Sequence, residues 1–282
     1  MAVCPRWWGI KIIMLIKRTI TSLALAAVGI PAIIFGGIYY FLLILLFLGA
    51  AAWEYGQIFS HMNCKPSQPI LIGGVILVVV ARTYLPTLES AALVLTVLVA
   101  MAWHLLDYEK GRDQAATDFA VTVSGIVYVG WIGSYLVSLR NMPDGLWWVL
   151  IVLPTIWLAD MAAYFIGSRY GRHTLSPRLS PKKTWEGYWA GVVCGTISAV
   201  LLALLWHAIG GPGVLWWKAA ALGAALSVLT TLGDLGESML KRQAGVKDSS
   251  NIFPGHGGVL DRIDSWLWGA VLGYFLITWF LL

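Results

Sequence analysis

Acidic, basic and hydroxyl side chains gather late in the chain, on one face of a predicted helix. Three ionisable groups and a hydroxyl fall there at positions i, i+3, i+4 and i+7, namely Asp234, Glu237, Ser238 and Lys241. Carboxylate oxygens are the ligands that Mg²⁺ prefers, and lysines form strong charge-assisted hydrogen bonds with phosphate oxygens. This face therefore predicts chemistry on a phosphate group.

A second polar stripe opens the last apolar stretch of the chain, where Asp261, Asp264 and Ser265 repeat the helical spacing. Three glycines precede it: Gly255, Gly257 and Gly258. Glycine lets a backbone approach a ligand closely, and a helix N-terminus favours an anion. Two carboxylate stripes beside such a turn are what metal-assisted transfer from a nucleotide requires. The alternative, a surface lattice of salt bridges, gives no reason for confining so many polar residues to one membrane face.

His256 lies between two of these glycines, which places it for ligand contact or loop stabilisation. Zinc binding is not indicated there, because no second His or Cys is near in sequence. The three cysteines, Cys4, Cys64 and Cys194, form no CxxC pair, so neither a disulfide framework nor a zinc site is predicted.

Asp160 is predicted about two helical turns, roughly 10 Å, inside the membrane interface. An ionised carboxylate there costs several kcal/mol unless it has a partner or a water-filled cavity. Ala163 and Gly167 follow at i+3 and i+7, so the same face allows a second helix to pack closely. The structural alternative is a buried Asp that a neighbouring hydroxyl or Arg satisfies.

The segment 180–187 supplies two ammonium groups and two hydroxyls in what is predicted to be one short turn before a helix. This chemistry suits phosphate oxygens. The candidate substrate-binding residues of the segment are Ser180, Lys182, Lys183, Thr184 and Glu186.

Composition defines the kind of fold that must position these groups. The chain has 282 residues, of which 59% are hydrophobic and only 12% are charged. Soluble domains carry about twice that charge. Apolar stretches of roughly 20 residues, long enough to cross a bilayer, recur along the chain. We therefore expect an all-α, polytopic helical membrane protein.

Breaks at charged, Pro and Gly residues divide the chain into nine candidate spans. They lie near 20–35, 38–59, 70–86, 88–106, 120–139, 146–167, 188–209, 214–236 and 263–282. With a cytoplasmic N-terminus, only Arg82, Arg140 and Lys218 of the 19 Lys and Arg residues fall on the far side, leaving 16 inside. Cytoplasmic loops are enriched in Lys and Arg, so this bias supports nine spans and a cytoplasmic N-terminus.

Polar residues are distributed unevenly between the predicted segments. We expect an N-terminal membrane segment over 1–60, a middle membrane segment over 61–140 and a C-terminal catalytic membrane domain over 141–282. Apart from Arg82 and Glu89 near the ends of their spans, charge within the spans of the first two segments is limited to Glu54, near a predicted cytoplasmic end. The chemistry is therefore expected in the last segment.

The C-terminal motifs resemble the signature of the phosphatidate cytidylyltransferases, also called CDP-diacylglycerol synthases. The match runs through Ser238, Lys241-Arg242, Lys247-Asp248, Pro254-Gly255-His256-Gly257-Gly258 and Asp261-Arg262-Ile263-Asp264. Earlier parts of the pattern are Asp160 with Ala163-Tyr164, Ser180 to Thr184, Glu186-Gly187 and Gly233-Asp234 with Glu237. The resemblance covers 157–265, whereas the N-terminal half is similar only in spanning the membrane.

The resemblance implies a nucleotidyltransferase that converts CTP and phosphatidate into CDP-diacylglycerol and pyrophosphate for phospholipid synthesis. It implies Mg²⁺, with K⁺ as a candidate second cation, and a site facing the cytoplasm in a bacterial inner membrane. Asp234 and Asp261 would bind the metal, and the catalytic set would be Asp234, Asp261, Lys241 and Lys247. The remaining motif positions would bind substrate: Asp160, Ser180, Lys182, Lys183, Thr184, Glu186, Glu237, Ser238, Arg242, His256, Gly257, Gly258, Arg262 and Asp264.

Two other functions are compatible with parts of this pattern. A CTP-dependent polyprenol kinase would use similar phosphate chemistry but release CDP rather than pyrophosphate. A transporter would explain Asp160 and the Gly-interrupted spans, although transporters tend to have repeated halves and midplane sites. A nucleic-acid partner is not expected despite the net charge of +5, since no basic stripe with interleaved aromatics is present. A homodimer is a candidate assembly.

Overall fold

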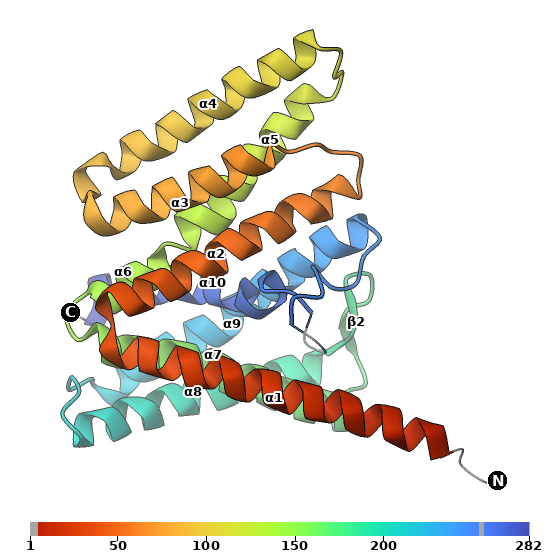
Figure 1. Ribbon diagram of the computed structural model, residues 1–282. Coiled ribbons are helices and arrows are strands. Elements are labelled where there is room, and N and C mark those ends of the chain that lie inside the picture. Colours follow the sequence, from red (N-terminus) through yellow and green to blue (C-terminus); the bar gives the residue numbers. More distant parts are fainter. Residues whose placement is uncertain (1–4, 254–256, 282) are drawn as a thin grey trace.

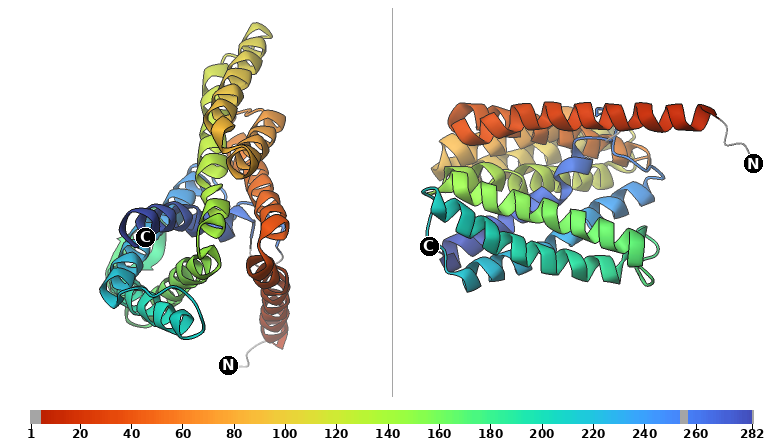
Figure 2. Two further views of the ribbon diagram at one scale, coloured as in Figure 1. Left: turned by 90° about the vertical axis from the view of Figure 1, so that its left-hand side faces the viewer. Right: turned by 90° about the horizontal axis from the view of Figure 1, so that it is seen from below.

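A computed structural model describes residues 5–253 and 257–281 and shows a bundle of long helices (Figure 1). The helices of the N-terminal half are α1 Pro5–Phe35, α2 Gly37–Ser60, α3 Gln68–Tyr84, η1 Pro86–Leu88, α4 Glu89–Glu109, α5 Ala115–Gly125, η2 Ile126–Ile132 and α6 Tyr135–Asn141. Those of the C-terminal half are α7 Gly145–Tyr170, α8 Trp185–Ala208, α9 Trp216–Gln243, α10 Leu260–Leu276 and η3 Ile277–Leu281. Most of them run along one common direction (Figure 2).

Seven of the described helices are long and apolar enough to cross a membrane. They cover 37–60, 86–109, 115–141, 145–170, 185–208, 216–243 and 260–281. Two shorter apolar helices, 21–35 and 68–84, occupy the remaining predicted spans. The polytopic helical membrane fold is therefore confirmed.

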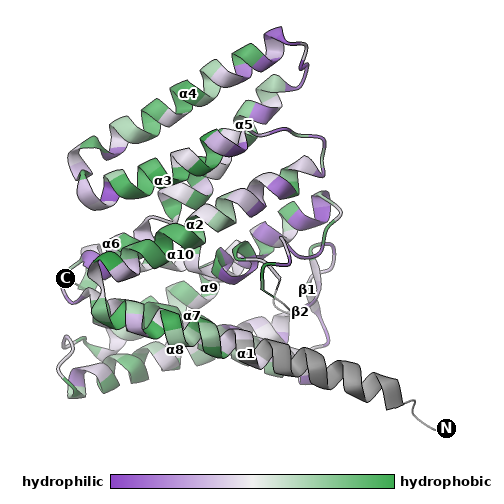
Figure 3. Cartoon of the chain, viewed as in Figure 1, coloured by the Kyte–Doolittle hydropathy of each residue, from purple (hydrophilic) through white to green (hydrophobic). Residues whose placement is uncertain are grey.

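The lipid-facing surface is apolar, as a bilayer requires. On α4, at one edge of the bundle, large side chains such as Val94, Leu98 and Leu105 are exposed (Figure 1). Hydrophilic residues gather instead at the ends of the helices, notably around the connection between α9 and α10 (Figure 3).

Small residues bring α7 and α8 into close contact. A Cβ added at Gly187 or Gly191 would meet the backbone oxygen of Ala163 or Ala159 on α7. One added at Gly195 would meet Ser227 of α9. The predicted close approach on the Asp160 face is confirmed, and it fixes α7, α8 and α9 relative to one another.

Packing also joins the two halves of the chain. A Cβ added at Gly133, directly after η2, would meet the backbone oxygen of Val129 and the side chains of Leu48 on α2 and Leu267 on α10. Both leucines are fully buried. Since α2 and α10 meet at this point, residues of the N-terminal segment can reach the C-terminal polar cluster.

The structure differs from the sequence prediction in three places. The segment 180–187 is not one short turn: Ser180–Thr184 forms strand β2, which pairs antiparallel with β1, Thr174–Ser176. The helix α9 continues to Gln243, beyond the predicted end of its span at 236. Its last turns carry the charged stripe and extend past the apolar run, so hydropathy alone missed them. The first span is part of one helix, α1, that begins at Pro5.

Candidate active site

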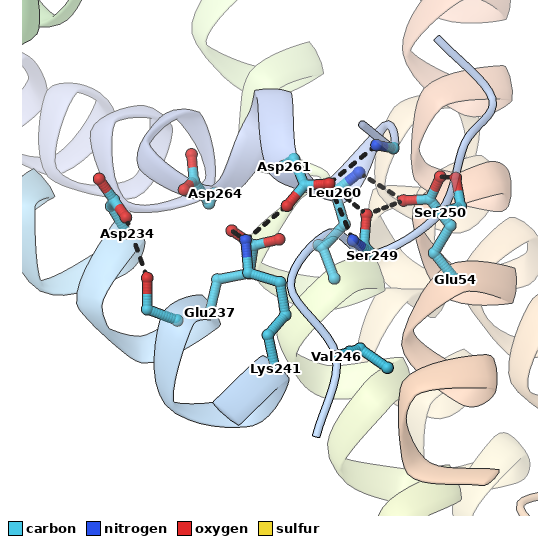
Figure 4. A network of polar contacts seen from close by, with 12 residues as sticks. Glu54, Asp234, Glu237, Lys241, Val246, Ser249, Ser250, Leu260, Asp261 and Asp264 are labelled. Carbon is cyan, nitrogen blue, oxygen red and sulfur yellow. Dashed lines mark hydrogen bonds and ion pairs between the residues drawn. The ribbon is translucent and has the colours of Figure 1, made fainter. Parts of the chain in front are cut away.

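The predicted polar residues meet where the ends of α7, α9 and α10 lie beside strand β2 and the end of α2. Most of the carboxylates come from α9 and α10, because their i, i+3 and i+4 spacing places them on facing helix surfaces. Figure 4 shows that Glu237, Lys241 and Asp261 point toward one another, with Asp234 and Asp264 to one side. Two lysine-centred groups of contacts organise the site.

The first group is centred on Lys241, whose side chain is only 11% exposed. Its ammonium donates to Glu237 Oε2 at 2.9 Å and to Asp261 Oδ1 at 2.5 Å (Figure 4). Glu237 is one helical turn before Lys241 on α9, whereas Asp261 comes from α10. A buried cation held by two carboxylates joins the two helices, and removing it would leave uncompensated buried charge.

Asp261 is held in one orientation by its other oxygen. Oδ2 accepts hydrogen bonds from the backbone N–H groups of Ser249 at 2.9 Å and Gly258 at 2.8 Å. The Ser249 hydroxyl lies 2.9 Å from the same oxygen. Gly257 precedes this turn with φ +84°, and a Cβ there would meet the Asp261 carboxylate. At Gly257 and Gly258 the backbone thus approaches a carboxylate of the protein itself. The predicted approach to a ligand stays a prediction, and Gly255 lies outside the described residues.

The second group is centred on Lys183, which pairs with Asp234 Oδ2 at 2.5 Å. Ser238 donates to the other oxygen of Asp234 at 3.4 Å. Asp160 of α7 is close enough to interact electrostatically with both Asp234 and Lys183. Strand β2 therefore supplies a cation to an acidic patch that α7 and α9 share.

Carboxyl groups outnumber lysines between the two groups. The buried carboxylate of Asp264 interacts with Asp234, Asp160 and Glu237. Glu237 Oε1 is buried and accepts no hydrogen bond from the described residues. Two buried carboxyl groups side by side can share a proton or take up a cation.

No group of three or more His, Cys, Asp or Glu side chains within 5–253 and 257–281 converges as metal ligands. Mg²⁺ is commonly held by one or two carboxylates with waters and substrate phosphates. The acidic patch around Asp234 fits that mode of binding, which needs no complete protein cage.

Several predicted residues support the site from the β-hairpin. Thr184 accepts a hydrogen bond from Gly187 N at 3.2 Å and caps α8. Glu186 pairs with His173, Nδ1 to Oε1 at 2.6 Å, and accepts backbone N–H groups of Arg172 and His173. These contacts hold the chain before β1 and the end of β2 at the start of α8, and so fix the base of the hairpin that carries Lys183.

The remaining predicted residues lie at the edge of the site. Arg242 donates to the backbone oxygens of Leu179 and Val246. Four basic residues are exposed: Lys182, Arg242, Lys247 and Arg262. Ser180 is half-buried at the start of β2. His256 lies outside the described residues.

Three residues of this region were not predicted as part of it: Glu54, Ser249 and Ser250. Glu54 is completely buried on α2 and accepts hydrogen bonds from both serine hydroxyls, at 2.8 and 2.5 Å. A charged residue within an apolar span indicated that Glu54 has a role, but the sequence did not indicate which residues it would contact.

The fold and this site define a multi-pass membrane protein with a charged centre at one end of its helix bundle. Residues 16–280 match the model of the cytidylyltransferase family, so the chain belongs to that family.

Relatives match over nearly the whole chain. A phosphatidate cytidylyltransferase of Pseudomonas aeruginosa is 35% identical over 276 residues, covering 94% of this chain and 97% of the relative. One from Synechocystis is 32% identical, covering 93% and 96%. One from Mycobacterium leprae is 32% identical, covering 76% and 71%. The similarity therefore includes the N-terminal half, where no motif was recognised.

Proposed function

We propose that this protein transfers the cytidylyl group of CTP to phosphatidate, giving CDP-diacylglycerol and pyrophosphate. The observation that carries the proposal is the pair of lysine-centred groups, Lys183 with Asp234 and Lys241 with Asp261, at one end of the bundle. Lysines beside carboxylates suit a polyphosphate with its metal, and the surrounding apolar helices suit a lipid substrate. Family membership supports the same activity.

In the proposed reaction, a phosphate oxygen of phosphatidate attacks the α-phosphorus of CTP as the bond to pyrophosphate breaks. A phosphate monoester is already largely ionised near pH 7, so the reaction needs no strong general base. Lys183 and Lys241 would stabilise charge on the phosphates, and the exposed residues Lys182, Arg242 and Lys247 would bind the departing pyrophosphate. Arg262 belongs to the same proposed basic rim.

Asp234 and Asp261 are the proposed ligands of Mg²⁺, with K⁺ as a candidate second cation near the acidic patch. The bound metal would neutralise phosphate charge during displacement. Both aspartates pair with lysines in this structure. We infer that the two ammonium groups exchange these carboxylates for phosphate oxygens when substrate binds. Asp160, Glu237 and Asp264 would tune the charge of the same patch.

We further propose that all nine apolar helices cross a bacterial cytoplasmic membrane, with the N-terminus and the site on the cytoplasmic side. The excess of Lys and Arg predicted on that side supports this orientation, and CTP is available there. In this arrangement 141–282 is the catalytic part, and 1–60 and 61–140 are supporting membrane segments. A homodimer is the proposed assembly.

The test is incorporation of label into lipid. Purified full-length protein in detergent would be incubated with Mg²⁺, phosphatidate and CTP labelled at the α-phosphate. Labelled lipid that disappears with EDTA is the expected result. If γ-labelled CTP instead labelled an added polyprenol, with release of CDP, the activity would be that of a kinase, and silence in both assays would favour transport.

A further inference from the structure

Glu54 connects the N-terminal half of the chain to the polar site. It is 0% exposed on α2, and each of its carboxylate oxygens accepts two hydrogen bonds. Oε1 binds the Ser250 hydroxyl at 2.5 Å and Val259 N at 2.8 Å. Oε2 binds the Ser249 hydroxyl at 2.8 Å and Leu260 N at 2.7 Å. One side chain therefore joins the middle of the connection between α9 and α10 to its end at α10.

The two backbone donors belong to the start of α10. Val259 is the N-cap residue and Leu260 the first residue of the helix. The first N–H groups of a helix have no partner within it, and a carboxylate placed there is favourable. Glu54 thus caps α10 from another helix and fixes where α10 begins, one residue before Asp261.

Ser249 links Glu54 directly to Asp261. Its hydroxyl lies 2.8 Å from Glu54 Oε2 and 2.9 Å from Asp261 Oδ2. A serine has one hydroxyl proton, which it donates to one carboxylate at a time. Figure 4 shows the resulting chain of contacts from Glu54 through Ser249 and Asp261 to Lys241.

Packing leaves little freedom in this arrangement. A Cβ added at Gly258 would meet the Ser249 hydroxyl and both oxygens of Glu54. Gly258 N also donates to Asp261, so the same backbone segment touches both carboxylates. A displacement of Glu54 would therefore be transmitted to the orientation of Asp261.

We propose that Glu54 is a positioning residue of the reaction, which sets the orientation of Asp261 through Ser249 and the first turn of α10. The expected effect on the reaction rate rests on the proposed function. The contacts between Glu54, Ser249 and Asp261 do not depend on that function. It assigns part of the reaction machinery to α2, in the segment where no motif was recognised.

Full-length Glu54→Gln and Glu54→Asp proteins test this role. Whichever way the glutamine amide is turned, its NH₂ group faces the N–H of Val259 or Leu260. Both groups are donors, so that hydrogen bond is lost. We expect Glu54→Gln to lower kcat roughly 10- to 100-fold, with KM for CTP within about a factor of three. Glu54→Asp keeps two acceptor oxygens and should recover part of kcat. A Gln variant with wild-type kcat, or an Asp variant no better than the Gln variant, would overturn the proposal.

Two serine variants test whether Glu54 acts on Asp261 through Ser249. Ser249→Ala and Ser250→Ala each remove one hydroxyl that touches Glu54, but only that of Ser249 also touches Asp261. Ser249→Ala should therefore lower kcat more than Ser250→Ala, and equal values would contradict the proposal. This comparison tests the step through Ser249, and Glu54→Asp tests Glu54 itself if Glu54→Gln does not fold.

Amide hydrogen exchange separates this inference from the proposed function. Exchange at 258–260 should be faster in the Ser249→Ala and Glu54→Gln proteins than in the wild type, because the capping contacts weaken. If wild-type protein incorporates no cytidylyl label, the proposed function fails, and the exchange rates still test the positioning. Unchanged exchange at 258–260 in both variants would overturn it.

Discussion

Lys183 of strand β2 forms an ion pair with Asp234 of α9, with 2.5 Å between Nζ and Oδ2. The two residues are far apart in sequence, and the β-hairpin is what brings them together. Side chains alternate between the two faces of a strand, so the neighbouring Lys182 points away from this pair. Of the two adjacent lysines, Lys183 therefore contacts the acidic patch and Lys182 does not.

Replacement of Lys183 by Ala should affect activity more than the same replacement of Lys182. We expect Lys183→Ala to lower kcat/KM for CTP roughly 10²-fold and Lys182→Ala less than about tenfold, since only Lys183 reaches the acidic patch. Incorporation of α-label into lipid measures both. Equal losses would show that the two lysines act only as a common positive charge.

Asp261→Asn should abolish most of the activity in a protein that still folds, because Lys241 keeps its contact with Glu237. The amide keeps the size of the side chain but removes the charge that pairs with Lys241, so we expect a loss on the order of 10²- to 10³-fold in kcat. Asp113→Asn, at an exposed position between α4 and α5, is the matched control and should behave as wild type. Near-normal activity of Asp261→Asn would refute its assignment to the metal.

Lys241→Met should destabilise the protein. It leaves Glu237 and Asp261, whose side chains are 1% and 6% exposed, facing each other without a cation. Breaking a buried ion pair on one side costs about 3–5 kcal/mol. Thermal unfolding in detergent should therefore shift to lower temperature. Adding Glu237→Gln should recover part of the loss, and a double variant less stable than Lys241→Met would argue against this account.

Gly195→Ala tests the contact between α8 and its neighbours. The new Cβ would meet Ser227 and Ala159, so overpacking should cost about 1–3 kcal/mol. At Gly73 on α3 a Cβ has nothing within 4 Å, so Gly73→Ala should cost no stability. Thermal unfolding of the two variants in detergent measures the difference. Similar midpoints would mean that the close contact between α8 and its neighbours does not contribute to stability.

Hydropathy predicted the membrane helices well because each apolar run has to cross the same bilayer thickness. It failed at Ser180–Thr184, where polar residues form a hairpin with no apolar alternation to reveal it. It also ended α9 at 236, although the helix continues to Gln243 through a charged face.

Helical spacing predicted which carboxylates of α9 and α10 would lie together, as Glu237 and Asp264 do. It could not predict the partners of Glu54, because Val259 lies 205 positions away in the chain. Contacts at that separation depend on how α2 and α10 pack, which no local pattern encodes.

The position of Glu54 bears on how far the protein can be divided. A fragment starting at residue 141 would contain every recognised motif, yet the N–H groups of Val259 and Leu260 would lose the carboxylate that accepts them. The same fragment would lose both Leu48 and Gly133, which lie beside Leu267 of α10. We therefore expect the two halves to unfold as one cooperative unit. Neither a truncated gene nor an exchange of N-terminal segments between relatives is expected to preserve the centre unless α2 comes with it.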